Sequence, residues 1–273
     1  MDDAQIKEMV RARYGGIAAS AGEDSCCGPQ ARGDAAEKSR AIGYSEAELA
    51  AAPDGANLGL GCGNPQAIAA MRPGETVIDL GSGAGFDCFL AARQVGDTGR
   101  VIGVDMTHEM LLKARDNAAR IGAANVEFRL GELEHLPVAD DTADVIISNC
   151  VINLVPDKPQ VFREAFRALK PGGRLAVSDV INIVPLSAEL RADPTLLCGC
   201  VAGAAPKTEI EAWLLGAGFT DIRIAENPAS RDTISGWAPG RGVENHVVSA
   251  IIEARKPLPG EGPACCAPSC CAS

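Results

Sequence analysis

The stretch VIDLGSGAG at residues 77–85 joins a short apolar strand to a glycine-rich turn that opens a helix. Asp79 lies in the strand, and three glycines follow it at alternate positions, namely Gly81, Gly83 and Gly85. Glycines in such a turn let the backbone approach a ligand closely and adopt conformations that a Cβ atom would forbid. Phe86 stands where a G-x-G-x-x-G dinucleotide motif has its third glycine, so the pattern does not favour a pyrophosphate.

The flanking sequence alternates short apolar strands with amphipathic helices. The predicted strands are residues 76–80, 101–105, 126–130, 144–148 and 174–179, and the predicted helices begin at Gly85, Thr107 and Pro159. Such alternation is typical of a doubly wound, mostly parallel α/β sheet. Outside it we expect a helix over residues 4–19, a capping box at Ser45 and Glu48, an irregular segment over 181–205, a helix over 208–216, and strands over 219–225 and 246–255.

The second predicted strand ends at Asp105, near the spacing from the first glycine at which an acidic residue binds ribose hydroxyls. The D-x-G-x-G-x-G run with this second acid resembles the class I methyltransferases that use S-adenosylmethionine (SAM). The resemblance implies a Rossmann-like sheet with SAM as cofactor, and it places Asp79 near the amino group of SAM, Met106 on adenine and Glu132 at the base edge. The implied cofactor-binding residues are Asp79, Gly81, Ser82, Gly83, Gly85, Asp105, Met106, Glu132, Leu133 and Asn149. A nicotinamide-dependent Rossmann enzyme and a glycine turn without a ligand are the alternatives.

Composition limits the classes of partner. The chain has 273 residues, a formal net charge of −11 and a pI near 4.8, which oppose attraction to nucleic acid or to an anionic membrane. Aromatic residues make up 4%, which offers neither a base-stacking platform nor an evident subunit interface, so we expect no nucleic-acid partner and a monomer. The sequence has no signal-peptide pattern and no long apolar run, so we expect a cytoplasmic protein without a membrane partner.

Eleven cysteines stand out in a chain that we expect in a reducing compartment, where disulfide scaffolds are rare. Cys150 lies just past the predicted strand 144–148, and open α/β sheets bind ligands beyond the carboxyl ends of their strands. Cys62 and Cys200 lie in similarly glycine-rich segments, GCGNP and CGC. A buried cysteine can act as a small apolar residue, which is our interpretation of Cys88, but several thiols near one site favour a soft, thiophilic ligand.

With these thiols the sequence resembles the arsenite methyltransferase family. The motifs that carry the resemblance are Tyr14-Gly15 before the Cys26-Cys27 pair, GLGCGNP at 59–65, SNCVINL at 148–154 and GCVAGA at 199–204. The resemblance implies that Cys150 and Cys200 bind As(III), and that Cys62 is a third ligand or forms a disulfide during turnover. It also implies an N-terminal partner for Cys62, and spacing leaves open whether this is Cys26 or Cys27. Cys198 has no place in the pattern.

These signatures together predict methyl transfer from SAM to thiolate-bound As(III), with arsenite and methylarsenite as substrates and arsenic detoxification as the role. Because the nucleophile is a lone pair that loses no proton, positioning and desolvation matter more than a general base, and no role falls to His108, His135 or His246. Oxidised arsenic then needs an external thiol reductant, thioredoxin or glutathione. The rival functions are a quinone-type methyltransferase for a small organic acceptor and a non-enzymatic thiol buffer or sensor for metalloids.

Along the chain we expect four regions. Residues 1–55 form an N-terminal helical arm with a cysteine loop, and residues 56–182 form the SAM-binding domain. Residues 183–256 carry Cys200 and two closing strands, and residues 257–273 form a flexible cysteine-rich tail. The four cysteines of that tail are either a soft-metal trap or dispensable.

Overall fold

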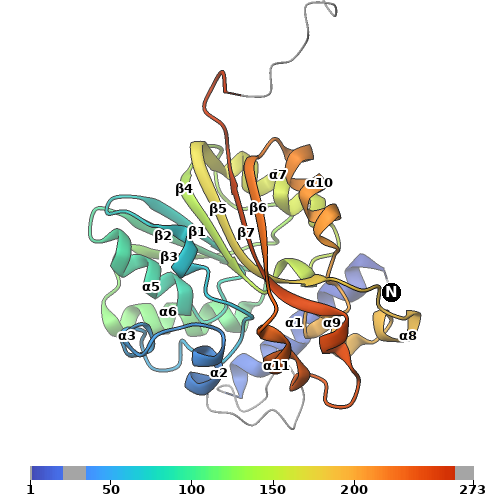
Figure 1. Ribbon diagram of the computed structural model, residues 1–273. Helices are drawn as coiled ribbons and strands as arrows, with labels where there is room; N and C mark the ends of the chain where they lie inside the picture. Colours follow the sequence, from blue (N-terminus) through green and yellow to red (C-terminus); the bar gives the residue numbers. More distant parts are fainter. Residues whose placement is uncertain (1, 21–34, 262–273) are drawn as a thin grey trace, which may run out of the picture.

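The computed structural model describes residues 2–20 and 35–261, and its centre is a seven-stranded sheet (Figure 1). The strands are β1 (Thr76–Leu80), β2 (Arg100–Asp105), β3 (Val126–Leu130), β4 (Ala143–Asn149), β5 (Leu169–Asn182), β6 (Thr220–Asn227) and β7 (Val247–Arg255). Their order across the sheet is β3-β2-β1-β4-β5-β7-β6. β1 to β5 pair in parallel, and β7 runs antiparallel to both of its neighbours. The predicted doubly wound α/β fold is confirmed.

Helices cover both faces of this sheet (Figure 1). They are α1 (Asp3–Ala19), α2 (Ala35–Ala41), α3 (Glu46–Ala51), α4 (Gln66–Ala69), α5 (Phe86–Val95), α6 (His108–Ile121), α7 (Lys158–Ala168), α8 (Ala188–Arg191), α9 (Pro194–Cys198), α10 (Lys207–Ala217) and α11 (Ser230–Ser235), with short 3-10 turns η1 (Ile152–Leu154) and η2 (Val243–Asn245). α5 contacts β1 and β2, while α7 and α10 pack against each other and against β5 and β6.

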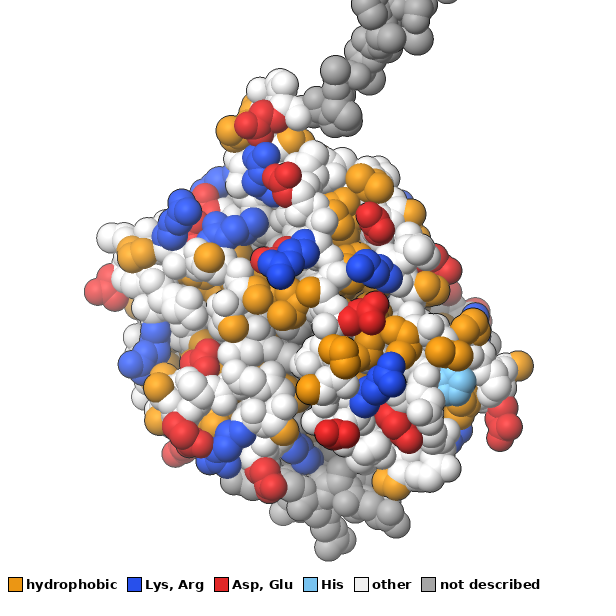
Figure 2. Space-filling model, viewed as in Figure 1, with side chains coloured by type: hydrophobic (Ala, Val, Ile, Leu, Met, Phe, Trp, Pro, Cys, Tyr) orange, Lys and Arg blue, Asp and Glu red, His pale blue; other side chains and the backbone are white. Residues whose placement is uncertain are grey.

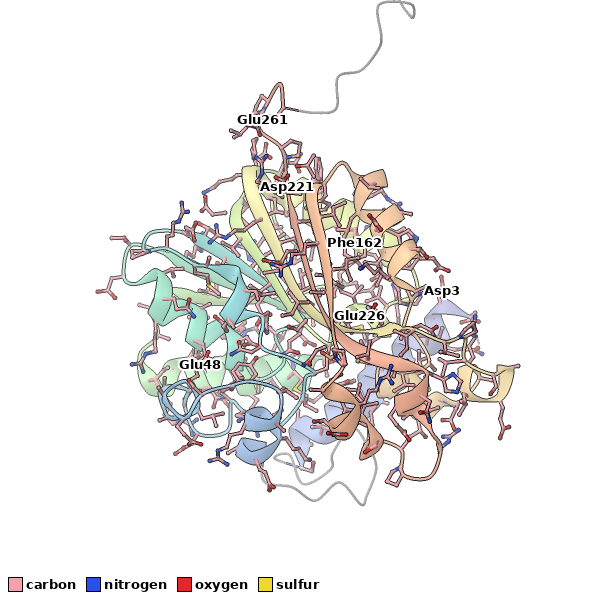
Figure 3. All side chains as sticks on the ribbon, in the orientation of Figure 1. Asp3, Glu48, Phe162, Asp221, Glu226 and Glu261 are labelled. Carbon is pink, nitrogen blue, oxygen red and sulfur yellow. The ribbon has the colours of Figure 1, made fainter. Side chains whose placement is uncertain are left out.

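The alternation of side chains along β1 builds the two hydrophobic layers. Val77 packs in one cluster with Phe89 of α5, and the next residue, Ile78, packs in another with Phe162 of α7. Figure 3 shows Phe162 on the side of the sheet that α7 and α10 cover. Successive side chains of a strand point to opposite faces, so a strand covered on both faces needs an unbroken apolar run. This explains why β1 is apolar after Thr76, with Asp79 as the exception.

The segment 181–205 differs from the prediction of irregular structure. β5 continues to Asn182, and α8 and α9 follow. Ser187 and Asp193 cap these helices, each accepting hydrogen bonds from backbone N–H groups of the first turn. The prediction was wrong because capping stabilises helices that are too short to reveal themselves by apolar spacing. The short helix α11 was likewise not predicted.

The N-terminal helix and the predicted capping box at Ser45 and Glu48 agree with the sequence analysis. α1 packs against α6 and α9. The hydroxyl of Ser45 accepts a hydrogen bond from the Glu48 N–H, and the Glu48 carboxylate accepts one from the Ser45 N–H. Cys26, Cys27 and the cysteines of residues 265–271 lie outside the described residues, and the division into four regions stays a prediction.

The surface of the described part is polar and mixed in charge. Within residues 2–20 and 35–261, no helix is long and apolar enough to span a membrane. Acidic and basic side chains are interspersed over the face seen in Figure 2. At one end of the sheet, Arg255 bonds the carboxylates of Asp221 and Glu261, which lie near each other in Figure 3. These pairs tie the chain that leaves β7 to the start of β6.

Candidate active site

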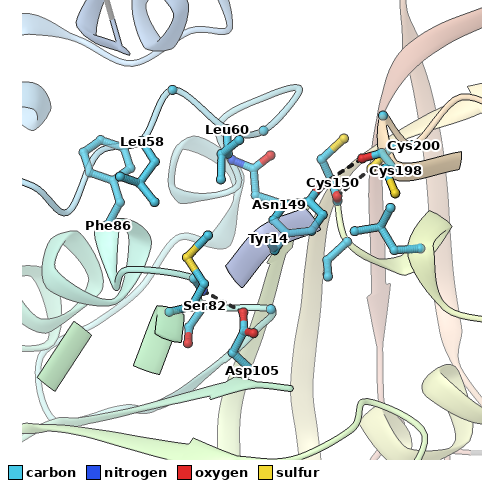
Figure 4. A pocket seen from close by; sticks show the side chains of 18 of the residues that line it. Tyr14, Leu58, Leu60, Ser82, Phe86, Asp105, Asn149, Cys150, Cys198 and Cys200 are labelled. Carbon is cyan, nitrogen blue, oxygen red and sulfur yellow. Dashed lines mark hydrogen bonds between the residues drawn. The ribbon is translucent and has the colours of Figure 1, made fainter. Parts of the chain in front are cut away.

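A cavity of about 780 Å³ opens beyond the carboxyl ends of β1, β2 and β4. Its walls come from α1, the glycine turn after β1, residues 56–61, the segment after β4 and the end of α9. Ser82 and Asp105 lie at one end and Cys150, Cys198 and Cys200 at the other (Figure 4), and we call these the glycine-turn end and the thiol end. Both the place and the volume are typical of small-molecule sites, which measure about 300–1,000 Å³.

The backbone of the glycine turn is shaped to approach a ligand. Gly81, Gly83 and Gly85 have φ values of 71°, 51° and 90°, in the left-handed region that favours glycine. A Cβ atom on Gly81 would lie only 2.4 Å from Cγ2 of Val151. The carboxylate of Asp105 accepts hydrogen bonds from Gly83 N at 2.9 Å and Thr107 N at 2.8 Å. These bonds hold the acid against the turn.

Two polar side chains of this end are buried. The hydroxyl of Ser82 is buried without a hydrogen-bond partner in the described residues. Asp79 is 3% exposed and accepts a hydrogen bond from the thiol of Cys88 at 3.2 Å. Burial, and then the charge of Asp87, raises the pKa of Asp79 well above its usual range. A cationic ligand group beside Asp79 relieves both effects.

These residues fit SAM. The acid Asp79 suits its amino group, and Asp105 suits ribose hydroxyls. Met106, Met110 and Leu133 line the same cavity and offer an apolar surface to an adenine ring.

Three thiols gather around the opposite end. The ligand atoms of Cys62, Cys150 and Asp179 all lie within 4.8 Å of one another. The thiol of Cys200 donates a hydrogen bond to the carbonyl oxygen of Cys150 at 2.8 Å. Burial raises the pKa of the Cys62 thiol to about 11. The Cys200 contact lowers the pKa of Cys150, but its hydrogen bond with Cys62, its burial and the nearby charges together raise it well above its usual range. Without a ligand, these raised pKa values favour the protonated form of the Cys62 and Cys150 thiols at neutral pH.

The backbone at the thiol end is strained. Cys150 has φ 57° and Cys200 has φ 63°. For a residue with a Cβ atom, the left-handed conformation costs roughly 1–2 kcal/mol. Such strain persists only where the surrounding structure enforces it, and it is common at functional sites.

Asn149 links the two ends through a buried hydrogen-bond network. Its Oδ1 accepts from Cys62 N at 3.1 Å, and its Nδ2 donates to Gly63 O at 2.8 Å. The same Nδ2 donates to the hydroxyl of Tyr44, which in turn donates to Asp87 Oδ1 at 2.7 Å. The Asn149 amide therefore fixes the loop that carries Cys62.

The structure brings most of the sequence-predicted site residues to the cavity wall. Those that line it are Asp79, Gly81, Ser82, Gly83, Asp105, Met106, Leu133, Asn149, Cys150 and Cys200. Glu132 instead pairs with Lys7 and Arg11 of α1. Gly85 begins α5, and Cys62 lies behind Cys150, lining a smaller cavity of about 70 Å³. Cys88 is completely buried in the core, as predicted.

Sequence reasoning missed Asp179, Asp87 and Tyr44. Asp179 is an acid in the second half of β5, which is buried throughout, and an acid in a buried strand was a signal that could have found it. The α1 residues Lys7 and Val10 also line the cavity, and nothing local to α1 indicated this.

Comparison with known proteins agrees with this arrangement. A family model described as a methyltransferase domain matches residues 71–219. The solved structure of an arsenic (III) S-adenosylmethionine methyltransferase from Chlamydomonas reinhardtii is similar, with a TM-score of 0.62 and 33% identity, covering 84% of this chain and 76% of that one. The fold and the glycine-turn end thus define the chain as a class I SAM-dependent methyltransferase.

Two relatives indicate which methyltransferase family the chain belongs to. The arsenite methyltransferase of Halobacterium salinarum is 51% identical over 268 residues, which cover 94% of this chain and 68% of that protein. The arsenite methyltransferase of Homo sapiens is 40% identical over 157 residues, covering 54% of this chain and 42% of that protein. The chain belongs to the arsenite methyltransferase family, although it spans only part of the length of these relatives.

Proposed function

We propose that this chain transfers methyl groups from SAM to trivalent arsenic bound by the thiols of Cys62, Cys150 and Cys200, with arsenite and methylarsenite as substrates and arsenic detoxification as the role. Arsenite has three hydroxyls to exchange and can bind all three thiols, whereas methylarsenite has two and binds two of them. The observation that carries the proposal is the convergence of buried thiols at one end of a cavity whose other end fits SAM. Thiolates are soft ligands that select thiophilic centres. A methyltransferase for an organic acceptor has no need of such a cluster.

At the glycine-turn end, the proposal assigns the SAM amino group to Asp79, the ribose to Asp105 and the adenine ring to Met106 and Leu133. Glu132 was expected at the base edge, but its ion pairs with Lys7 and Arg11 engage it. The turn glycines allow close approach of the backbone. When bound, SAM supplies a methyl group activated by a sulfonium charge.

At the thiol end, the protein binds and orients arsenic. Each thiol replaces a hydroxyl of arsenite, and its proton leaves with that hydroxyl as water. The raised thiol pKa values are therefore compatible with binding, because a neutral thiol and a neutral arsenite give a neutral complex. The lone pair of arsenic is the nucleophile, so the protein supplies position and a water-poor environment rather than a base. None of the three histidines lines the cavity.

Completion of turnover extends the proposal to a reductant. Methyl transfer oxidises As(III), and a cysteine pair that returns the electrons becomes a disulfide. We propose that thioredoxin or glutathione reduces this disulfide, with Cys26 or Cys27 as the N-terminal partner of Cys62. A monomeric, cytoplasmic enzyme is the setting we expect for this chemistry.

The test is an incubation of the purified chain with arsenite, methyl-labelled SAM and a thiol reductant, followed by chromatography of arsenic species with elemental detection. The proposal expects labelled methylarsenicals from the parent chain and none from Cys200→Ser. Arsenic binding without any methylated product would favour a SAM-linked metalloid sensor. Label transfer to a quinone-type acceptor, retained in Cys200→Ser, would favour the organic methyltransferase.

A further inference from the structure

The thiol end contains one more potential ligand group, the carboxylate of Asp179 in β5. Asp179 is 3% exposed, and one of its oxygens lies within 4.8 Å of both the Cys62 and the Cys150 sulfur. Three donors orient the carboxylate, namely Ile152 N at 3.0 Å, Asn153 Nδ2 at 2.8 Å and Val180 N at 2.8 Å. The proposed binding of arsenic by three thiolates makes no use of this acid.

The charge of Asp179 is unfavourable in the free protein. Burial raises its pKa, while the three hydrogen-bond donors and the charge of Lys158 oppose the rise by stabilising the ionised carboxylate. That negative charge raises the pKa of Cys62 and Cys150 and so disfavours their thiolates. Burying this charge costs free energy and disfavours the thiolates. The cost is offset if the charge stabilises a state that forms later in the reaction.

The reaction supplies such a state. As(III) bound by three thiolates is neutral. Its lone pair forms the arsenic–carbon bond, and the carbon–sulfur bond of the sulfonium breaks with its electron pair staying on sulfur. Sulfur becomes a neutral thioether, As(III) becomes a methylated As(V) cation, and no proton moves. The positive charge thus passes from the glycine-turn end to the thiol end.

We propose that the carboxylate of Asp179 stabilises the positive charge that develops on arsenic during methyl transfer. This inference rests on the proposed function. The carboxylate repels the free thiolates, interacts little with the neutral As(III) complex, and attracts the As(V) cation. It therefore stabilises the transition state more than the bound substrate. In a buried site a fixed charge acts strongly and needs no reorganisation when the reaction occurs.

The charged neighbours of Asp179 make the sign of the effect testable. Lys158 at the start of α7 donates to Val155 O at 3.0 Å and attracts Asp179 electrostatically. Among the described residues, the thiols of Cys62 and Cys150 also face Asp179. The positive charge of Lys158 weakens the attraction between Asp179 and the arsenic cation. Loss of the Asp179 charge should therefore slow methyl transfer, and loss of the Lys158 charge should speed it.

The first variant is Asp179→Asn, with Asp221→Asn as the matched control. Asp221 lies at the start of β6, where the register shifts between Thr220 and Arg223, and its φ of 52° is one that Asn tolerates. Its side chain is 66% exposed. We expect Asp179→Asn to slow single-turnover methyl transfer on the order of 100-fold. The affinity for As(III) should stay the same or increase. It can be measured by quenching of the fluorescence of Trp237, which packs against the cluster that contains Cys62. The thiols, titrated by thiolate absorbance without arsenic or SAM, should become more acidic.

The second variant, Lys158→Met, keeps the inference testable if Asp179→Asn folds poorly. At pH 8 we expect it to transfer methyl groups faster than the parent chain. An unchanged rate in Asp179→Asn, a loss of As(III) affinity that matches its loss of rate, or a Lys158→Met rate at or below the parent rate would each overturn the inference. A parent chain that binds both ligands and forms no methylarsenical contradicts the proposed function itself, which separates the two failures.

Discussion

At the glycine-turn end of the cavity the left-handed backbone belongs to glycines, whereas at the thiol end it belongs to Cys150 and Cys200. Glycine adopts this conformation without a steric penalty, so the turn can form from local sequence. Cysteine does so only under strain that tertiary contacts must enforce. The glycine-turn end is therefore a property of one strand–turn–helix unit, and the thiol end is a property of the whole fold.

The sources of the side chains show the same difference. Asp79 and Asp105 end adjacent parallel strands, which pair residue by residue in β1 and β2. Cys62, Cys150 and Cys200 come from a loop before α4, the segment after β4 and the segment after α9. The two ends meet where Val151 packs over Gly81 and where Asn149 holds the Cys62 loop. The first three variants below change one end of the cavity or the link between the two ends, and the fourth changes neither.

The largest effect is expected from Cys150→Ser, which disturbs only the thiol end. Loss of one ligand of a chelate removes a high effective concentration, so methyl transfer to arsenic should fall by about 100-fold or more. SAM affinity, measured by calorimetry, should change little because the glycine turn is intact. A parallel loss of SAM affinity would mean that the two ends are not separable.

The next effect is expected from Asp105→Ala, which disturbs the other end. The change removes charged hydrogen bonds to ribose and to the N–H groups of Gly83 and Thr107, so SAM affinity should fall roughly 10- to 100-fold. Quenching of Trp237 by As(III) should be unaffected. Asp116→Ala on the exposed face of α6 is the matched control. Equal SAM affinity in the two variants would remove Asp105 from the site.

A smaller effect tests the link. Asn149→Ala leaves the N–H of Cys62 and the carbonyl of Gly63 without their side-chain partner, and it should lower the free energy of unfolding by about 1–3 kcal/mol in urea. As(III) affinity should fall because the Cys62 loop loosens. Asn149→Asp can still accept from Cys62 N–H, so it should retain more As(III) affinity than Asn149→Ala. The reverse order would show that the amide does not position this loop.

The smallest effect lies outside both ends, at Glu127 of β3. Hydrogen bonds from Arg129, opposed by burial, and then from Arg100 lower the pKa of Glu127 to about 2. A lowered pKa contributes stability above the unfolded value of 4.5, and this is lost as the pH falls toward 2. The side chain is 41% exposed, so solvent limits the contribution to less than about 1 kcal/mol. Urea unfolding of Glu127→Gln and the parent chain should differ slightly at neutral pH and converge in acid.

Prediction from sequence succeeded where the signal is local. The strands, the glycine turn, the Ser45 capping box and the buried Cys88 all follow from neighbouring residues. It failed at residues 181–205, where short capped helices leave no periodic signal. It also gave no sign that Glu132 pairs with Lys7 and Arg11, which are far away in sequence. It also overlooked Asp179, whose importance depends on the thiols that surround it.

The sequence by itself determined that the chain forms a parallel α/β sheet with a methyltransferase glycine turn, because strand alternation and glycine conformations depend on nearby residues. Motif resemblance likewise indicated which thiols belong to the site. Only the tertiary structure placed Cys62 behind Cys150, brought Cys200 to the carbonyl of Cys150, and set the acid Asp179 beside them. Side chains from distant segments meet through packing and long-range hydrogen bonds, which sequence spacing does not encode.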